Sequence, residues 1–273
     1  MPHLRSTGAD LYYEVTGEGD PLVLVHGSWT DHTGWRSVVP ALAASHRVVV
    51  YDRRGHSRST GGTGPGSRTR DEDDLAALPE RLDLAPAHVV GNSYGASTAL
   101  GLGARRPELF RGLVAHEPPL LATVANDPEL RPLMRVARDR IDAVVELLRA
   151  GDDRGGAHLF VEEVALGPGM WERLPDRARE TFVANAATFL DEQNDPHWDE
   201  LDVTRLSALT APVLPSYGTT SPPWFARIVG GLADAIAHAR IRTLEGAGHV
   251  PHTTHPELYV ATVTGFPADP TAG

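Results

Sequence analysis

Cysteine and lysine, two side chains that carry much of the covalent chemistry of enzymes, are both absent from this 273-residue sequence. Without cysteine there is no disulfide, no thiolate nucleophile and no thiolate metal ligand. Without lysine all 25 basic residues are arginine, which excludes a Schiff-base intermediate and the lysine of a phosphate-binding P-loop. A nucleophile in this chain must therefore be another residue type.

The sequence also lacks a long apolar run and an excess of positive charge. No stretch approaches the roughly 18 apolar residues that a membrane span needs, and residues 1–10 lack the basic and then apolar pattern of a secretory signal. We therefore expect a cytoplasmic protein without a membrane partner. The formal net charge of −11 argues against a nucleic-acid partner, because phosphate binding needs clustered cations.

Apolar and helical segments alternate along the chain, which predicts an α/β fold. Short apolar runs that are typical of buried parallel strands occur at 11–15, 21–25, 47–51, 88–90, 112–115, 211–214 and 241–244. Helical periodicity predicts helices at 35–44, 71–82, 94–105, 223–237 and 256–264. This order favours one mostly parallel sheet with helices on both faces.

One interval breaks the alternation. From 120 to 209 there is no good strand, and helical segments are predicted at 130–150, 157–165 and 176–190. A helical insertion between two strands of an open α/β sheet is expected to cover the carboxyl ends of the strands, where such sheets bind ligands. The chain is therefore divided into an α/β core, 1–119 and 210–273, and a helical cap or lid, 120–209.

Two local patterns could be taken for binding sites but favour simpler structures. The acidic run Asp71–Asp74 precedes leucines at helical spacing, and acidic residues in a first helical turn favour the helix dipole. We interpret this run as a helix start and not as a metal site. The glycine-rich segment 61–66 neither follows a strand directly nor ends in Lys-Ser or Lys-Thr, so it is interpreted as a short flexible loop and not as a phosphate loop.

The candidate nucleophile is Ser93, in the pattern Gly91-Asn92-Ser93-Tyr94-Gly95. An apolar strand precedes this pattern, and a helix of small residues follows it. The two glycines allow a sharp turn from strand to helix, because they have no Cβ to collide with neighbouring backbone. Such a turn exposes the Ser93 Oγ and aims the N-terminus of the next helix at it.

A serine nucleophile needs a base that takes its proton. His249 follows the last predicted strand in Gly246-Ala247-Gly248-His249, and the glycines let this loop approach the nucleophile. The neighbouring histidines are less suitable, since His255 precedes Pro256 at an expected helix start and His252 has no glycine beside it. We therefore predict that His249 is the base.

Acyl transfer also needs N–H donors for the negative charge that develops on the substrate oxygen. The backbone N–H of Tyr94, directly after the candidate nucleophile, is one expected donor. The other is expected just past a strand in the first half of the sheet, where an apolar run leads into His26-Gly27-Ser28-Trp29. Ser28 is the first choice for this donor and Trp29 the second.

In these residues the sequence resembles the α/β-hydrolase superfamily, and the resemblance covers nearly the whole chain. It rests on four motifs in the family's order: His26-Gly27 after the third strand, residues 51–59 after the fourth, Gly91–Gly95, and Gly246–His249. The resemblance implies an α/β-hydrolase fold with a helical lid inserted after the sixth strand. It also implies a serine hydrolase whose catalytic triad follows the order serine, acid, histidine.

The sequence departs from the family at the triad acid. Members usually carry a Gly-x-x-Asp pattern where this chain has Gly218-Thr219-Thr220-Ser221, and serine cannot hold a negative charge beside an imidazolium. Some members, including certain haloalkane dehalogenases and the zearalenone lactonases, place the acid after the preceding strand, in a pattern similar to His116-Glu117-Pro118-Pro119. The resemblance therefore implies Glu117 as the acid. The alternatives are Asp202, Asp234 and a Ser-His dyad without an acid.

The predicted reaction is cleavage of a small carboxylic ester or lactone through an acyl-serine intermediate, without a metal or an organic cofactor. Trp29, Met170 and Trp171 are candidates for lining the substrate pocket, although each fits an apolar core equally well. The fold also supports C–C bond hydrolysis, hydroxynitrile lysis and cofactor-free oxygenation, and a non-catalytic ligand-binding or biosynthetic cyclase-like protein is a rival hypothesis. The sequence leaves open the identity of the substrate and the oligomeric state, a homodimer included.

Overall fold

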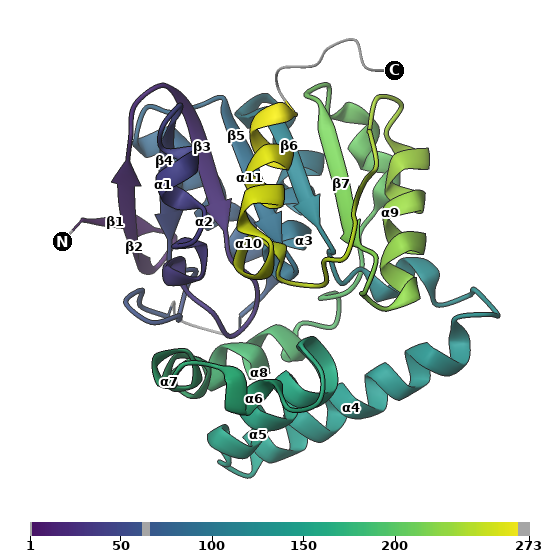
Figure 1. Ribbon diagram of the computed structural model, residues 1–273. Coiled ribbons are helices and arrows are strands. Elements are labelled where there is room, and N and C mark those ends of the chain that lie inside the picture. The colour runs from purple at the N-terminus through teal and green to yellow at the C-terminus, as the bar shows by residue number, and fades with distance from the viewer. Residues whose placement is uncertain (1, 62–65, 267–273) are drawn as a thin grey trace.

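The computed structural model describes residues 2–61 and 66–266, and an eight-stranded sheet forms their centre (Figure 1). In chain order the strands are β1 (His3–Ser6), β2 (Ala9–Thr16), β3 (Asp20–Val25), β4 (His46–Tyr51), β5 (Ala87–Asn92), β6 (Phe110–His116), β7 (Val213–Gly218) and β8 (Arg242–Leu244). Their spatial order is β1-β2-β4-β3-β5-β6-β7-β8. The pairs β1/β2 and β2/β4 are antiparallel and the others are parallel. The prediction of a mostly parallel sheet is confirmed.

Helices cover both faces of this sheet, as predicted. One face packs against α1 (Val39–Leu42) and α11 (Pro256–Gly265), and α10 (Pro251–Thr254) precedes α11. The other face packs against α2 (Arg68–Arg81), α3 (Tyr94–Arg105) and α9 (Pro223–Ala235).

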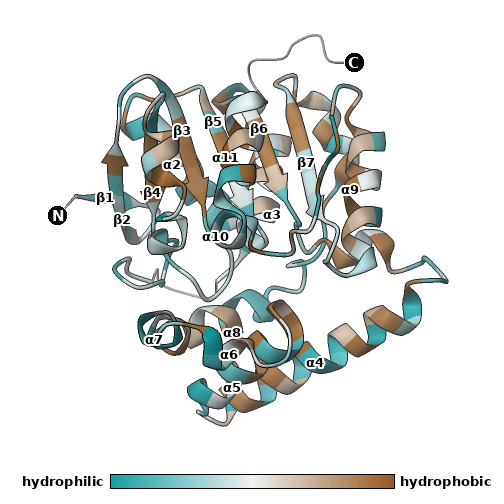
Figure 2. Ribbon diagram, viewed as in Figure 1, coloured by the Kyte–Doolittle hydropathy of each residue, from teal (hydrophilic) through white to brown (hydrophobic). Residues whose placement is uncertain are grey.

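The central strands are apolar on both faces because both faces are buried. In β3, Leu22 and Leu24 join the core under α1 and α11, whereas Val23 and Val25 join the core under α2, α3 and α9. This alternation is the two-residue period of a pleated strand. Figure 2 shows the resulting hydrophobic colour along the central strands.

The structure differs from the predicted elements at several places. The short antiparallel strand β1 was not predicted, since its four residues carry no apolar run. The helix expected at 35–44 is only a 3₁₀ turn, His32–Trp35, followed by the four-residue α1. The helix expected from Asp71 begins three residues earlier, at Arg68, where Ser67 caps its N-terminus. Residues 62–65 of the glycine-rich segment lie outside the described residues.

The chain between β6 and β7 contains helices and no strand, and we refer to residues 117–212 as the helical insertion. Its α-helices are α4 (Arg131–Arg149), α5 (Asp153–Leu159), α6 (Met170–Arg173), α7 (Asp176–Ala184) and α8 (Ala186–Asn194). The insertion lies across the end of the core at which the parallel strands terminate, with α4 as its long outer edge (Figure 1).

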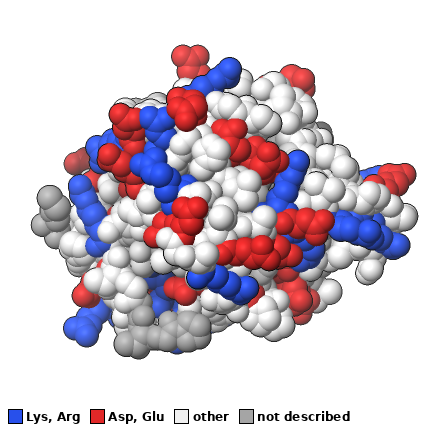
Figure 3. Space-filling view, turned by 90° about the horizontal axis from the view of Figure 1, so that it is seen from below, with Lys and Arg blue, Asp and Glu red and all other residues white. Residues whose placement is uncertain are grey.

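The insertion has an apolar core of its own, built around the helices that pack on α4. Viewed from below, acidic and arginine side chains are intermixed on the face that it forms, without a patch of one sign (Figure 3). None of the helices in the described part of the chain is both long and apolar enough to cross a membrane.

His252 provides a test of the packing beside the sheet. Its ring packs between Trp35 and Tyr259, with centroids 4.4 and 5.8 Å away, and its Nδ1 has no hydrogen-bond partner among the described residues. Burial lowers the pKa of His252 to about 3. The unfolded chain takes up a proton at this residue below about pH 6.5, but the folded protein does not, so stability falls as the pH drops from about 6.5 towards 3.

We expect His252→Phe to flatten the pH dependence of the melting temperature between pH 7 and 4, because phenylalanine keeps an aromatic ring and takes up no proton. The slope removed is about 1.4 kcal/mol per pH unit. Thermal melts across this range measure it, with the exposed His197→Gln as the control. The prediction would be contradicted if the melting temperatures of His252→Phe and of the unchanged protein fell equally steeply with pH.

Candidate active site

Ser93 is the single residue between β5 and α3, where the chain turns sharply. Its φ and ψ are 55° and −127°, a sparsely populated region for a residue with a side chain. The turn is so tight that a Cβ on Gly91 would lie 2.6 Å from the Ala96 Cα, and one on Gly95 would lie 2.3 Å from the Val25 carbonyl oxygen. The two glycines of the motif are thus required by close backbone approach, as the sequence predicts.

Glu117 and His249 are directly hydrogen bonded. The His249 Nδ1 lies 2.7 Å from the Glu117 Oε2, and the other carboxylate oxygen accepts the Gly218 N–H at 2.8 Å. Glu117 directly follows the last residue of β6 and has a φ of 48°, so the backbone turns left-handed there. The structure therefore brings together the predicted base and the carboxylate that the resemblance implies.

The electrostatics of this pair favour the ionised carboxylate. Glu117 is completely buried, whereas the side chain of His249 is 18% exposed. Burial raises the pKa of Glu117, but the hydrogen bond and charge of His249, followed by His116 and the Gly218 N–H, outweigh it and leave this pKa below its ordinary value. A carboxylate that stays charged can orient an imidazole and offset its positive charge.

Contacts from three elements hold the His249 loop at the end of β5. The Asn92 Nδ2 donates to the His249 carbonyl at 2.9 Å, which ties the residue before Ser93 to the base. The His116 Nε2 donates to the Gly248 carbonyl at 3.2 Å, and the Phe225 ring stacks on the His249 ring at 5.4 Å. Neither the Ser93 Oγ nor the His249 Nε2 bonds to another described residue, and both side chains are partly exposed.

The predicted oxyanion donors are unpaired in the part of the chain that the structure describes. Among those residues, nothing accepts the backbone N–H of Ser28 or that of Tyr94. Gly27, which precedes Ser28, lies against Ser93, since a Cβ built on Gly27 would be 3.6 Å from the Ser93 Oγ. Trp29, the second choice, adopts a left-handed φ of 66°. Two free donors thus flank the serine at the ends of β3 and β5.

The alternative acids lie elsewhere. Asp202 is exposed and caps the 3₁₀ turn Val203–Ala208, and Asp234 is exposed on α9. Ser221, at the position of the family's usual aspartate, is near the base loop, since its Oγ is 3.8 Å from a Cβ built on Gly248. That Oγ is buried and has no hydrogen-bond partner within the described residues.

The acidic run that the sequence predicts at a helix start lies near the N-terminus of α2. Asp71, Glu72 and Asp74 are all buried, and each pairs with arginine. Asp71 binds Arg53, and Asp74 binds Arg54 through two hydrogen bonds of 2.8 and 2.9 Å. The sequence signal for these pairs was the acidic run together with Arg53-Arg54 after β4.

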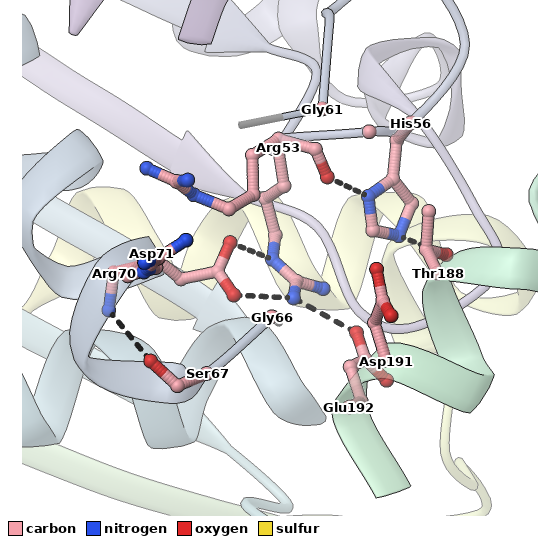
Figure 4. A pocket seen from close by; sticks show the side chains of 12 residues that line it. Arg53, His56, Gly61, Gly66, Ser67, Arg70, Asp71, Thr188, Asp191 and Glu192 are labelled. Carbon is pink, nitrogen blue, oxygen red and sulfur yellow. Dashed lines mark hydrogen bonds and ion pairs between the residues drawn. The ribbon is translucent and has the colours of Figure 1, made fainter. Parts of the chain in front are cut away.

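Arg53 also binds Glu192 of α8, and both residues line a polar pocket between the core and the insertion (Figure 4). Sequence reasoning missed Glu192. Nothing in the local pattern distinguishes it from a surface acid, because its partner is 139 positions away.

The three predicted pocket residues belong to the apolar core of the insertion. Trp29 is fully buried and stacks on Phe160, with centroids 5.0 Å apart. Trp171 is buried in the same cluster and Met170 packs against it. A role for Trp29, Met170 and Trp171 in lining a substrate pocket stays a prediction.

One group of buried side chains in the described residues has the spacing to hold a metal ion: Asp31, His32 and Asp52. These groups already have partners in the protein. Asp52 bonds to the His32 Nδ1 at 2.6 Å, and Asp31 accepts the Thr33 N–H at 2.8 Å and the Ser57 hydroxyl at 2.9 Å. The group is a hydrogen-bonded link between the segments after β3 and β4.

Comparison with known proteins agrees with this fold. The model of the alpha/beta hydrolase family matches residues 22–262. The chain is 28% identical over 287 residues to the "Putative carbamate hydrolase RutD" of Azorhizobium caulinodans, covering 97% of this chain and 98% of that protein.

Solved structures are similar over the same extent. An alpha/beta hydrolase from Sphaerobacter thermophilus is 28% identical, with a TM-score of 0.79 over 97% of this chain and 99% of that one. The N-acyl homoserine lactone degrading enzyme Est816 is 25% identical, with a TM-score of 0.73 over 97% and 100%.

The close approach at the serine turn predicts a position-specific effect of alanine. We expect Gly95→Ala to destabilise the protein by several kcal/mol, because the new methyl group would overlap the Val25 carbonyl and backbone would have to move. Gly230→Ala in α9 is the matched control: nothing lies within 4 Å of its Cβ position, and alanine favours a helix over glycine by about 1 kcal/mol. Chemical denaturation measures both. Equal free energies of unfolding for the two variants would refute the steric argument.

Proposed function

Because this chain belongs to the alpha/beta hydrolase family, we propose that it is a serine hydrolase that cleaves a carboxylic ester or lactone without a cofactor. The observation that carries the proposal is the 2.7 Å contact between Glu117 and the His249 Nδ1, at the strand ends that also present Ser93. The hydrogen bond between Glu117 and His249 resembles the acid–base half of a Ser-His-acid triad, and the chain order serine, acid, histidine is the same.

In the proposed reaction the His249 Nε2 takes the proton of Ser93 as its Oγ attacks the carbonyl carbon. The N–H groups of Ser28 and Tyr94 stabilise the oxyanion of the tetrahedral intermediate. His249 then gives the proton to the departing alkoxide, and the acyl-serine forms. A water molecule that His249 deprotonates attacks the acyl carbon, the carboxylic acid leaves, and Ser93 regains its proton.

Glu117 acts on the base and not on the substrate. It holds the tautomer of His249 that carries its hydrogen on Nδ1, which leaves Nε2 free to accept a proton, and its charge offsets the imidazolium. The names of the relatives support hydrolysis of a carbonyl compound in different forms, a carbamate in one and a lactone in another. An ester or lactone fits them and needs only water as the second reactant.

A fluorophosphonate probe tests the nucleophile. Its phosphorus is expected to bond to the Ser93 Oγ with loss of fluoride, so that intact mass increases by one adduct. Labelling should disappear in Ser93→Ala and persist in Ser207→Ala, which removes an exposed hydroxyl on the insertion. An unlabelled but folded wild-type protein would favour a non-catalytic binding protein on the same fold.

Replacing the acid tests the triad assignment. We expect Glu117→Gln to keep the fold and lower kcat by about 10⁴-fold, because the amide no longer holds the productive tautomer or offsets its charge. Turnover of p-nitrophenyl esters and of lactones of graded size measures this loss. Glu245→Gln, which removes an exposed carboxylate from the loop that leads to His249, is the control. Turnover of Glu117→Gln near the wild-type value would show that another group orients the base.

A further inference from the structure

Helix α8 and its N-cap residue Asn185 dock on the core through three polar side chains. The Asn185 Nδ2 donates to the carbonyls of Trp29 and Thr30 at 3.1 and 3.0 Å. Thr188 bonds to the His56 Nε2 at 3.0 Å, and Glu192 reaches further, to Ser28 and Arg53. The sequence spacing of three and four residues puts all three side chains on one helix face. That face meets the segments that follow β3 and β4.

Glu192 bonds directly to the residue that supplies one proposed oxyanion donor. The Ser28 hydroxyl donates to its Oε2 at 2.5 Å, and the Arg53 Nη2 donates to its Oε1 at 2.8 Å. Both Glu192 and Arg53 are buried. Burial raises the pKa of Glu192, and the charge of Arg53 opposes that increase. Both oxygens of one carboxylate from the insertion are therefore used by the core.

Arg53 contacts the surroundings of both proposed donors. Its guanidinium lies over the Tyr94 ring, 4.5 Å from the centroid, and its Nη1 donates weakly to the Gly27 carbonyl at 3.4 Å. Asp71 fixes the guanidinium from α2 through hydrogen bonds of 3.2 and 3.1 Å. Figure 4 shows Arg53 between Asp71 and Glu192.

These contacts orient the peptide between Gly27 and Ser28. The Arg53 N–H donates to the His26 Nε2 at 2.9 Å, so His26 carries its hydrogen on Nδ1 and donates it to the Gly27 carbonyl at 2.8 Å. In a trans peptide the C=O and the following N–H point in opposite directions. A fixed Gly27 carbonyl therefore turns the Ser28 N–H away from Arg53 and His26.

We infer that Glu192 is a positioning residue for the oxyanion hole. Glu192 holds Ser28 from the insertion side, and Arg53 links Glu192 to Tyr94. The inference rests on the proposed function. Preorganised donors stabilise developing charge because they need no reorganisation during the reaction, and a shift of about 1 Å in such a group costs about 10²-fold in rate. Glu192 touches neither the substrate nor the reacting atoms, so its loss should lower kcat and not raise KM.

A double-mutant cycle between Glu192→Gln and Ser28→Ala tests the inference. Ser28→Ala keeps the backbone N–H but removes the hydroxyl that binds Glu192. We expect each single variant to lower kcat, and the rate of fluorophosphonate labelling of Ser93, by about 10- to 100-fold, with KM within about twofold. If Glu192 acts through Ser28, the double variant should be no slower than the slower single variant.

Two controls separate positioning from stability. Asp74→Asn breaks the other buried ion pair between α2 and the segment after β4, and Thr188→Val removes a different contact of α8. Both should lower the melting temperature and leave kcat within about twofold. If Glu192→Gln does not fold, Ser28→Ala alone carries the test, since it leaves the Arg53 ion pairs in place.

The outcomes distinguish this inference from the proposed function. Wild-type protein that is not labelled at Ser93 overturns both. Wild-type labelling with unchanged rates in Ser28→Ala and Glu192→Gln overturns only the positioning role. If the fold-losses in kcat of the two single variants multiply in the double variant, Glu192 acts independently of Ser28, and the inference is overturned. A raised KM with an unchanged kcat also overturns it, because Glu192 would then act through substrate binding.

Discussion

The site depends on the close approach of the β5–α3 turn to the end of β3. Gly95 sits so near the Val25 carbonyl that a methyl group cannot be added without moving backbone. This contact places Ser93 beside Gly27, and the next peptide carries the Ser28 N–H. One steric constraint between two neighbouring parallel strands therefore sets the spacing between the serine and both unpaired donors. The fold therefore requires residues without a side chain at Gly27, Gly91 and Gly95.

Two groups of buried charge lie on either side of Ser93. Glu117 and His249 pair on one side of Ser93, and Arg53 is held between Asp71 and Glu192 on the other. Burying charges is costly unless they are paired and hydrogen bonded, and the hydrogen bonds of Glu117 and Arg53 meet that condition. The first group reaches solvent through the partly exposed side chain of His249, whereas Arg53 and Glu192 of the second are both buried.

The sequence predicted features that follow from local patterns. Apolar runs indicated the central strands that are buried on both faces. The glycines around Ser93 predicted a sharp turn, and the backbone angles of Ser93 describe that turn. The short β1 and the broken helix at 35–44 escaped prediction because tertiary contacts, and not periodicity, decide such brief elements. The acidic run was placed on a helix, but its buried arginine partners lie outside any local window. Glu192 shows the same limit, since only folding brings α8 to Arg53.

Helix α8 attaches the insertion to the core through a set of hydrogen bonds. A lid that opened at this helix would have to break the bonds of Asn185 to two carbonyls, of Thr188 to His56, and of Glu192 to Arg53 and Ser28. Opening there would break the buried ion pair between Arg53 and Glu192 and leave Arg53 paired with Asp71 alone, which is costly in a buried setting. It would also release the Ser28 loop. If the proposed site admits substrate by a movement of the insertion, these bonds favour movement in segments other than helix α8.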